Sequence, residues 1–232
     1  MDVPLYETLD GQVAVVTGAT RGIGKRIADG LVDLGATVYA GAREPADIAA
    51  EDRRAIELDV TIDDQRRAAI DRIERETGRL DILVNNAGIM DSREPLAEMS
   101  TEVIEQTLQT NLQGPILLTK HALALLVARP GGRVVNVSSG LGKLGQPQSG
   151  GMAGYRISKT GLNGLTRYLD GEYGDRGLLA NSVCPGYVQT DMTEESAPRT
   201  PQQGADTPVW LARFRPEAPG GAFWRDRAPK AW

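Results

Sequence analysis

The stretch Gln12-Val13-Ala14-Val15-Val16-Thr17-Gly18-Ala19-Thr20-Arg21-Gly22-Ile23-Gly24 decides the fold class of this 232-residue chain. Its first half is a short β-branched run, which predicts a buried strand, and its second half is a glycine-rich turn that leads into a helical pattern. Glycines here permit a tight turn, close approach of the backbone to a pyrophosphate, and close packing of helix on strand. The helix N-terminus adds free N–H groups and a favourable dipole. We therefore predict a dinucleotide-binding loop, the alternative being a glycine-rich turn that binds no ligand.

Strand and helix patterns alternate along the rest of the chain. The predicted strands are Gln12–Thr17, Thr37–Ala42, Arg54–Leu58, Ile82–Asn85, Arg133–Ser138 and Leu179–Cys184, with a last edge strand near Gly221–Phe223. The predicted helices are Gly22–Leu34, Ile62–Thr77, Thr101–Val127, Met152–Tyr173 and a shorter one near Gln202–Ala212. Such alternation predicts a single-domain α/β doubly wound Rossmann fold over residues 1–232. Its sheet would be mostly parallel, of six to seven strands, with helices on both faces.

The amino-acid composition of the chain argues against several classes of function. The chain is 41% hydrophobic and 25% charged with a net charge of -5, which is typical of a globular protein and indicates no nucleic-acid or anionic-membrane partner. We find no apolar run of transmembrane length and no signal-peptide pattern in Met1–Gly11. Cys184 is the only cysteine and is expected to be buried as a small hydrophobe; His121, the only histidine, is expected in a surface or packing role. We therefore expect a cytoplasmic location and no metal site.

The residues after the second predicted strand bear on the choice of cofactor. This strand ends Tyr39-Ala40-Gly41-Ala42-Arg43, with no acid at its tip to accept a hydrogen bond from a ribose 2′-OH. Arg43 and Arg21 could both face a 2′-phosphate, and either could instead be a solvated surface arginine. The pattern favours NADP(H), with NAD as the other possibility.

Tyr155 and Lys159 lie four residues apart in a predicted helix, so their side chains project from one face. A phenol is a poor acid at neutral pH, and an ammonium one turn away favours the phenolate. The pair therefore suits proton transfer, although its spacing also arises by chance.

Further motifs follow one another along the chain. They are the Thr17–Gly24 loop, Asp59-Val60, Asn85-Asn86-Ala87-Gly88, Asn111, Asn136-Val137-Ser138-Ser139, Tyr155 with Lys159, and Pro185-Gly186. On these motifs, the chain from Gln12 to Thr193 resembles the classical short-chain dehydrogenase/reductase family. The segments Arg133–Ser139 and Gly204–Leu211, with Trp232, look like its carbonyl-reductase branch.

The resemblance implies four catalytic residues. Tyr155 would donate a proton to a carbonyl oxygen, or accept one during alcohol oxidation, and Ser139 would hold that oxygen. Lys159 would bind the nicotinamide ribose and lower the pKa of Tyr155. Asn111 would bend its helix and help position a water leading to Lys159; the alternative is a tolerated polar residue. Ser138 competes with Ser139, and the family usually uses the second serine of such a pair.

The resemblance also implies a cofactor site. Asp59 and Val60 would contact the adenine, although Asp59 could be a plain helix N-cap partner. Asn85 would line the adenosine side of the groove, while the second asparagine, Asn86, would only stabilise the sheet. The full set of cofactor-binding candidates is Gly18, Thr20, Arg21, Gly22, Ile23, Gly24, Arg43, Asp59, Val60, Asn85, Ala87, Gly88, Tyr155, Lys159, Pro185, Gly186, Val188 and Thr190.

Two departures from the family pattern concern substrate and assembly. Ser139 and Tyr155 are sixteen residues apart, so the glycine-rich loop Gly140–Gly154 is slightly long and should affect substrate choice. The chain lacks the long insertion before the tyrosine that monomeric carbonyl reductases carry, so a homodimer or homotetramer is expected through faces of Thr101–Val127 and Gly161–Leu169. Residues 190–201 are a candidate substrate lid, with a surface loop as the alternative.

Together these features predict an NADP(H)-dependent oxidoreductase that transfers hydride between nicotinamide and a ketone, aldehyde or secondary alcohol. The alternatives are a 3-oxoacyl thioester reductase and a catalytically idle NADP-sensing or scaffold protein, because a fold alone does not establish function.

Overall fold

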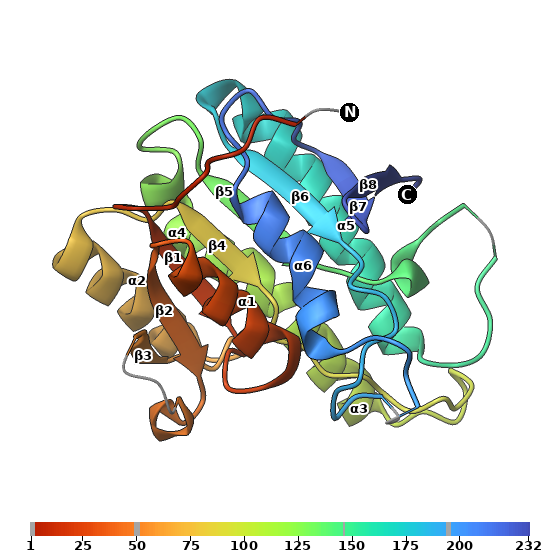
Figure 1. Ribbon diagram of the computed structural model, residues 1–232. Coiled ribbons are helices and arrows are strands. Elements are labelled where there is room, and N and C mark those ends of the chain that lie inside the picture. The colour runs from red at the N-terminus through yellow and green to blue at the C-terminus, as the bar shows by residue number, and fades with distance from the viewer. Residues whose placement is uncertain (1–2, 49–51, 146, 194–195) are drawn as a thin grey trace.

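A computed structural model describes residues 3–48, 52–145, 147–193 and 196–232. Within them the chain forms one mixed sheet with the strand order β3-β2-β1-β4-β5-β6-β7-β8 (Figure 1). The strands are β1 (Val13–Thr17), β2 (Thr37–Ala42), β3 (Arg54–Glu57), β4 (Ile82–Asn85), β5 (Arg133–Val137), β6 (Leu179–Val183), β7 (Ala222–Arg225) and β8 (Ala228–Lys230). Each neighbouring pair is parallel except β7 and β8, which are antiparallel. The predicted doubly wound α/β fold is confirmed.

In the described part of the chain, the sheet has eight strands, one more than the upper limit of the predicted six to seven. The extra strand is β8, which pairs with β7 through a tight turn at Asp226 and Arg227. Both turn residues have positive φ, 53° and 56°, as in the two-residue turns that match the twist of a hairpin. Asp-Arg lacks the glycine that usually marks such a turn, which is why the sequence did not indicate it.

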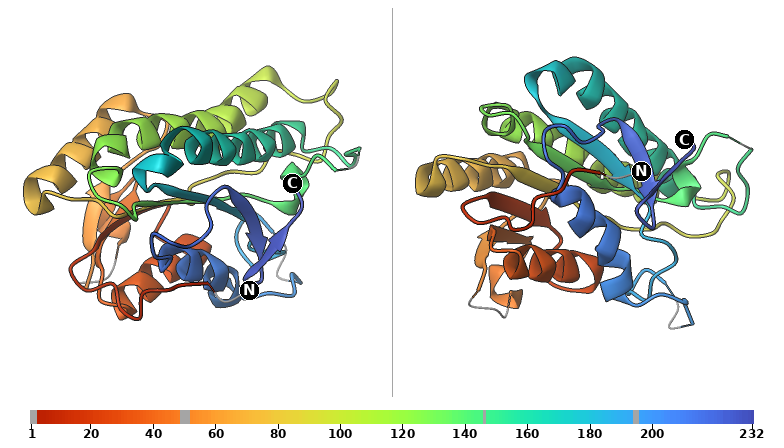
Figure 2. Two further views of the ribbon diagram at one scale, coloured as in Figure 1. Left: turned by 90° about the horizontal axis from the view of Figure 1, so that it is seen from above. Right: turned by 45° about the horizontal axis from the view of Figure 1, so that its top comes forward.

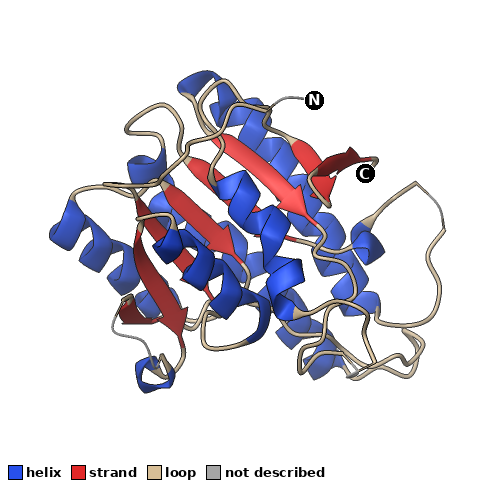
Figure 3. Cartoon of the chain, in the orientation of Figure 1, coloured by secondary structure: helices blue, strands red, loops and turns tan. Residues whose placement is uncertain are grey.

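Helices cover both faces of the sheet. Helices α1 (Gly22–Asp33) and α6 (Pro201–Ala212) pack together on one face, and α2 (Asp63–Thr77), α4 (Gly114–Leu126) and α5 (Ala153–Tyr173) lie on the other (Figure 2, left). Figure 3 shows the sheet between these two layers. Single helical turns occur at Pro45–Asp47, Gly140–Gly142 and Gly174–Arg176.

The predicted helix Thr101–Val127 differs from the structure. It consists of α3 (Thr101–Leu108), a π-helical turn (Gln109–Gln113) and α4, and Asn111 lies at the centre of the π turn. Such turns insert one extra residue into the helical ladder and frequently occur at functional sites.

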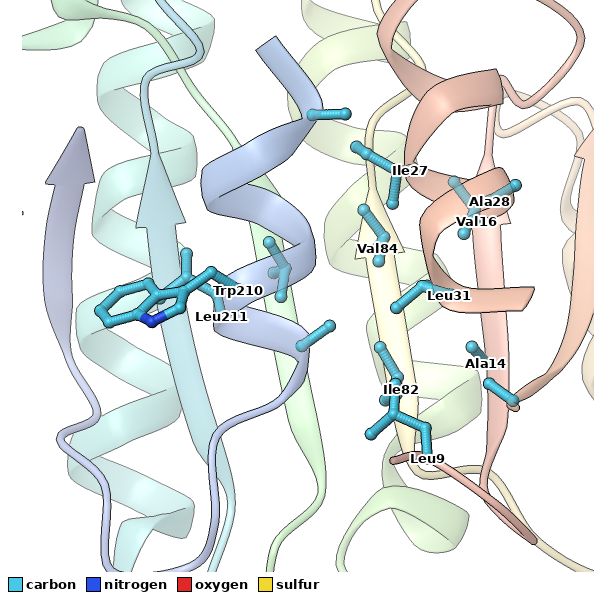
Figure 4. Packing of buried hydrophobic residues seen from close by; sticks show 14 of the residues in the cluster. Leu9, Ala14, Val16, Ile27, Ala28, Leu31, Ile82, Val84, Trp210 and Leu211 are labelled. Carbon is cyan, nitrogen blue, oxygen red and sulfur yellow. The ribbon is translucent and has the colours of Figure 1, made fainter. Parts of the chain in front are cut away.

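Two apolar clusters fill the space between the sheet and its helices. Alternate residues of β1 face opposite sides, so Ala14 and Val16 join the cluster under α1 and α6, whereas Val13 and Val15 join the one under α2, α4 and α5. Figure 4 shows part of the first cluster, in which Val16 lies beside Ala28 of α1, and Ile27 of α1 lies beside Val84 of β4. Because both faces are buried, β1 is apolar throughout rather than alternating.

The strand order brings the sequence motifs that follow β1, β4 and β5 together at one edge of the sheet. The chain runs outward from β1 to β3, then returns to β4 on the other side of β1, so the crossovers leave a crevice at the carboxyl ends of β1 and β4. The glycine-rich turn, the asparagine motif and the serine pair each follow one of the strands β1, β4 and β5, and therefore meet at this edge.

Candidate active site

The glycine-rich turn after β1 has the close contacts expected of a phosphate cradle. Gly18 has a φ of +64°, and a Cβ there would lie 3.0 Å from the Cα of Ala87. A Cβ on Gly24 would lie 2.2 Å from the Gly18 carbonyl oxygen. The Asn86 amide Nδ2 donates to the carbonyl oxygens of Thr17 (2.9 Å) and Gly18 (3.2 Å). These contacts hold the turn against the loop after β4.

The N-terminus of α1 suits a pyrophosphate. Its N-cap residue, Arg21, makes no side-chain capping bond, and the first turn carries no acidic residue. A Cβ on Gly22 would lie 3.4 Å from Cγ2 of Thr190, so Thr190 borders the same turn. Ile23, by contrast, packs toward the core and toward Gly204 of α6, so its backbone rather than its side chain is available to a cofactor. The residues present therefore fit a dinucleotide.

The two arginines of the predicted 2′-phosphate site differ in their surroundings. Arg43 directly follows β2 and is exposed. Arg21 lies on the turn after β1, where its Nε is 2.7 Å from Oδ2 of Asp191 in a largely exposed ion pair. Arg43 is therefore the arginine placed at the tip of β2, the position where an acid would select NAD.

Three candidates of the adenosine side have side-chain contacts within the protein. Val60 is buried in the core under α2, and the Asp59 carboxylate accepts bonds from the Thr61 N–H (2.8 Å) and hydroxyl (2.7 Å) in the turn before α2. The buried Asn85 Nδ2 donates to Asn136 of β5 (2.8 Å) and to Thr119 of α4 (3.3 Å).

The two asparagines make contacts in different directions. Asn85 links β4 to β5 and α4, while Asn86 links the end of β4 to the glycine-rich turn. The alternation of side chains at a strand end sends one residue into the helix layer and the next toward the crevice. A cofactor contact from Asn85 would therefore come from its backbone.

The four catalytic candidates converge beside this crevice. The Ser139 hydroxyl lies beside that of Tyr155 and acts to lower the pKa of the phenol, and Lys159 Nζ lies 5.5 Å from the centre of the Tyr155 ring. The Lys159 ammonium donates to the Val137 carbonyl at 2.8 Å. A Cβ on Gly88 would lie 3.1 Å from Oδ1 of Asn111 and 3.6 Å from Lys159 Nζ, so these groups share one small space.

Asn111 holds the loop after β4 through both ends of its amide. Its Oδ1 accepts from the Ile89 N–H (2.8 Å), and its Nδ2 donates to the Ile89 carbonyl (2.7 Å) and to Ser158 Oγ (3.2 Å). The side chain is fully buried, so it is not simply a tolerated polar residue on a helix surface. Its role in the structure is to join the π turn, the loop that carries Gly88, and α5.

The two serines after β5 have separate environments. Ser138 is buried, and its hydroxyl bonds to Asn163 Oδ1 (2.7 Å) and to the Lys159 carbonyl (3.2 Å). Ser139 is half-buried and its hydroxyl contacts Tyr155, while also accepting from the Leu141 N–H at 3.1 Å. Ser139 is therefore the serine next to the phenol.

The pKa values of Tyr155 and Lys159 both depart from their ordinary values. Burial raises the pKa of Tyr155; the neighbouring Ser139 hydroxyl opposes this, and the negative charge of Asp91 adds to it. Burial also lowers the pKa of Lys159 to about 8. In this arrangement burial is the largest influence on the pKa of both groups, and the Lys159 ammonium is bonded to a main-chain carbonyl.

The segment after β6 forms the last wall of the crevice. Gly186 has a φ of +87°, and a Cβ there would lie 2.6 Å from Cδ of Arg199. Val188 is buried and bridges to Arg199, and its carbonyl accepts from the Thr193 hydroxyl. This brings the half-buried Pro185 and Thr190 to the crevice edge. Residues 194 and 195 of the predicted lid lie outside the described residues.

Two residues at the site were not predicted to belong to it. Cys184 is buried as expected, but its Sγ also accepts a bond from the Gly140 N–H at 3.2 Å, directly after Ser139. Asp91 is buried and its Oδ2 accepts from the Tyr155 N–H at 3.2 Å. No periodicity marks Asp91, which follows the asparagine motif in a loop; the glycine before Tyr155, Gly154, is the one sequence feature that relates to it.

A doubly wound sheet with this cradle and this tyrosine–lysine–serine group defines an α/β oxidoreductase of the dinucleotide-dependent kind. The family model described as short chain dehydrogenase matches residues 12–201, and the chain belongs to that family. Among the described residues, no helix combines the length and the apolar character needed to cross a bilayer.

Similar proteins support the same assignment. The chain is 38% identical over 192 residues to the 3-oxoacyl-[acyl-carrier-protein] reductase FabG of Vibrio cholerae, covering 80% of this chain and 77% of that protein. The carbonyl reductase Sniffer of D. melanogaster superposes with a TM-score of 0.86 at 28% identity, covering 96% and 100% of the two chains. A short chain dehydrogenase from Burkholderia cenocepacia, solved in complex with NADP, gives a TM-score of 0.82 at 31% identity, covering 93% and 96%.

Proposed function

We propose that this protein is an NADP(H)-dependent oxidoreductase that transfers hydride between nicotinamide and a ketone, an aldehyde or a secondary alcohol. The observation that carries the proposal is the contact between the Tyr155 and Ser139 hydroxyls beside the Lys159 ammonium, at the edge where the glycine cradle lies. Two hydroxyls next to each other can both bond one carbonyl oxygen, which is what carbonyl reduction requires.

The roles of the side chains follow from their protonation. The raised pKa of Tyr155 keeps the phenol protonated at neutral pH, so it can donate its proton to the developing alkoxide. Ser139 would hold the carbonyl oxygen by a hydrogen bond and Lys159 would bind the ribose. The cofactor supplies the hydride when bound. The reverse reaction, alcohol oxidation, needs the phenolate and is therefore expected to be faster at high pH.

Removal of the phenol hydroxyl tests this function. Tyr155→Phe should retain NADPH binding and lose most ketone reduction, by 10²-fold or more as an order of magnitude. Tyr168→Phe is the matched control, because Tyr168 lies on the same helix and is 59% exposed. Wild-type ketone reduction by Tyr155→Phe would rule out the proposed role of the phenol.

The choice of NADP(H) is supported by the position of Arg43 and by the NADP complex of the Burkholderia relative. Arg43→Ala should weaken NADPH binding by about tenfold, equivalent to about 1.4 kcal/mol, and leave NADH binding unchanged. Arg75→Ala, an exposed change on α2, is the control. If the ratio of the two dissociation constants stays at its wild-type value, Arg43 does not read the 2′-phosphate.

A second candidate, a 3-oxoacyl thioester reductase, is favoured by the identity to FabG of Vibrio cholerae. The two candidates share the chemistry and differ in the substrate. Comparing kcat/KM for a 3-oxoacyl thioester with that for small ketones and aldehydes distinguishes them. NADPH binding without turnover of any of these compounds would favour the idle, cofactor-sensing alternative.

We propose a homodimer or homotetramer formed through α4 and α5. Ile116 on α4 is 40% exposed, and Ile157 and Tyr168 on α5 are 56% and 59% exposed, so apolar side chains on this layer face outward. Ile157→Glu should dissociate the assembly in analytical ultracentrifugation, whereas Leu144→Glu, at a more exposed site outside these helices, should not. We also propose a cytoplasmic location, and residues 190–201 as the substrate lid, whose described part is tied to the cradle by the Arg21–Asp191 ion pair.

A further inference from the structure

Asp91 is a buried carboxylate that the catalytic scheme above does not use. It lies in the loop after β4 and is 7% exposed. Its Oδ2 accepts a bond from the Tyr155 N–H at 3.2 Å, across 64 positions of sequence. Next to it, the Ser92 carbonyl accepts from the Met152 N–H at 3.2 Å. Two consecutive residues of this loop therefore hold the first turn of α5.

The start of α5 is built to receive this carboxylate. The N-cap residue Met152 is left-handed, with φ 58° and ψ 44°, and makes no side-chain capping bond. A Cβ on Gly154 would lie 2.8 Å from Asp91 Oδ2, so a glycine is needed for the carboxylate to approach. Asp91 thus caps α5 from a distant segment, where a negative charge is also favoured by the helix dipole.

The start of the same loop, at Gly88 and Ile89, is held beside the proposed cofactor site by Asn111. Asn111 bonds both main-chain groups of Ile89, two residues before Asp91, and also lies beside Gly88. The loop from Gly88 to Ser92 therefore connects the wall that would face the nicotinamide to the helix turn that carries Tyr155. A displacement of this loop would move the phenol relative to the hydride donor, and small misplacements of reacting groups are costly to rate.

The negative charge of the Asp91 carboxylate also affects the ionisation of the Tyr155 phenol. The groups that face Tyr155 are Ser139 after β5, Cys184 after β6, Lys159 on α5 and Asp91 after β4. Ser139 favours the phenolate, while the negative charge of Asp91 disfavours it. A nearby like charge stabilises the neutral form of an acid.

We propose that Asp91 is a positioning residue for Tyr155, which fixes the first turn of α5 from the loop after β4. Its charge adds to burial in keeping the phenol in its protonated, proton-donating form. The inference rests on the proposed function, in that the phenol is taken as the acid of carbonyl reduction. The loop after β4 would then shift the ionisation of the phenol, and with it the onset of alcohol oxidation, to higher pH. Gly154 also has a purpose here, namely to make room for the carboxylate.

The test separates geometry from charge with two variants. Asp91→Asn keeps an oxygen that can accept from the Tyr155 N–H and removes the charge, so kcat for reduction near neutral pH should stay within about threefold of wild type. The pH at which alcohol oxidation is half-maximal should fall by about 0.5. Asp91→Ala removes both effects, and its kcat should fall by about tenfold or more while the Kd of NADPH is unchanged.

A double-mutant cycle tests the contact with Gly154. Gly154→Ala should lower kcat as Asp91→Ala does, because its Cβ displaces the carboxylate. The double variant Asp91→Ala/Gly154→Ala should be no worse than either single variant, since the contact is already lost. Additive losses, or an unchanged pH profile in Asp91→Asn, would overturn the inference.

A readout without turnover keeps this inference separate from the proposed function. The ionisation of Tyr155 can be followed as the difference in tyrosinate absorbance between a protein and the same protein carrying Tyr155→Phe. If the wild type reduces no carbonyl compound, the proposed function fails. Even then, a lower titration midpoint of Tyr155 in Asp91→Asn supports the effect of the charge, and an unchanged midpoint overturns it.

Discussion

Gly24→Ala tests the phosphate cradle at its tightest point. The new Cβ would lie 2.2 Å from the Gly18 carbonyl oxygen and 2.3 Å from Asn86 Nδ2, where ordinary contacts begin near 3.4 Å. The turn must therefore move by about 1 Å, and such overpacking costs about 1–3 kcal/mol. A glycine-to-alanine change inside a helix returns up to about 1 kcal/mol. The net expectation is a loss of roughly 1–2 kcal/mol of unfolding free energy.

Two measurements follow from this estimate. The midpoint of thermal unfolding should fall by roughly 3–6 °C for a chain of this size. The displaced turn should also weaken NADPH binding by about tenfold or more in a fluorescence titration, because its backbone N–H groups would no longer converge on the phosphates.

Gly171→Ala is the matched control for Gly24→Ala. Gly171 is also inside a helix, α5, and a Cβ there would have no neighbour within 4 Å. This variant should be as stable as the wild type or more stable by up to about 1 kcal/mol, with unchanged NADPH binding. If Gly24→Ala behaved like Gly171→Ala in both measurements, the reasoning about the cradle would be refuted.

Two further predictions concern the catalytic group. The pKa of Lys159 is about 8 in the folded protein, against 10.5 ordinarily, so the unfolded chain binds this proton more tightly. As the pH rises from 8 to 10.5, the wild type should therefore gain roughly 2–3 kcal/mol of unfolding free energy relative to Lys159→Met, measured by denaturant titration. A difference that does not change with pH would contradict the lowered pKa. Ser138→Ala should cost about 1–3 kcal/mol of unfolding free energy, because its hydroxyl satisfies buried acceptors, and should keep kcat within about threefold of wild type. Ser139→Ala should keep the stability and lower kcat by about 10²-fold. The reverse pattern would exchange the roles of the two serines.

Patterns within short stretches predicted the elements of the fold. A strand buried on both faces must be apolar throughout, and a helix must repeat its apolar face, so the ranges Thr37–Ala42 and Ile82–Asn85 match β2 and β4, and the other ranges differ at their ends by one or two residues. The exceptions were β8, whose turn lacks glycine, and the π turn at Asn111, which interrupts a helical pattern without any change in that pattern.

The sequence did not show which of two neighbouring side chains at a strand end faces the crevice. Asn85 and Asn86 are identical in chemistry, and only the position of β4 between β1 and β5 decides which of them faces the crevice. Ser138 and Ser139 were separable only by analogy to a family, whereas the structure separates them by their contacts, with Asn163 and with Tyr155.

The sequence by itself determined the α/β class, the glycine-rich turn after the first strand and the helical spacing of Tyr155 and Lys159, because each of these depends on residues close together in the chain. The tertiary structure alone decided the burial that shifts the pKa values of that pair and the contact of Asp91 with the Tyr155 N–H. Both depend on burial and on neighbours distant in sequence. A pKa responds to the solvent that packing removes, and no local pattern records how much is removed.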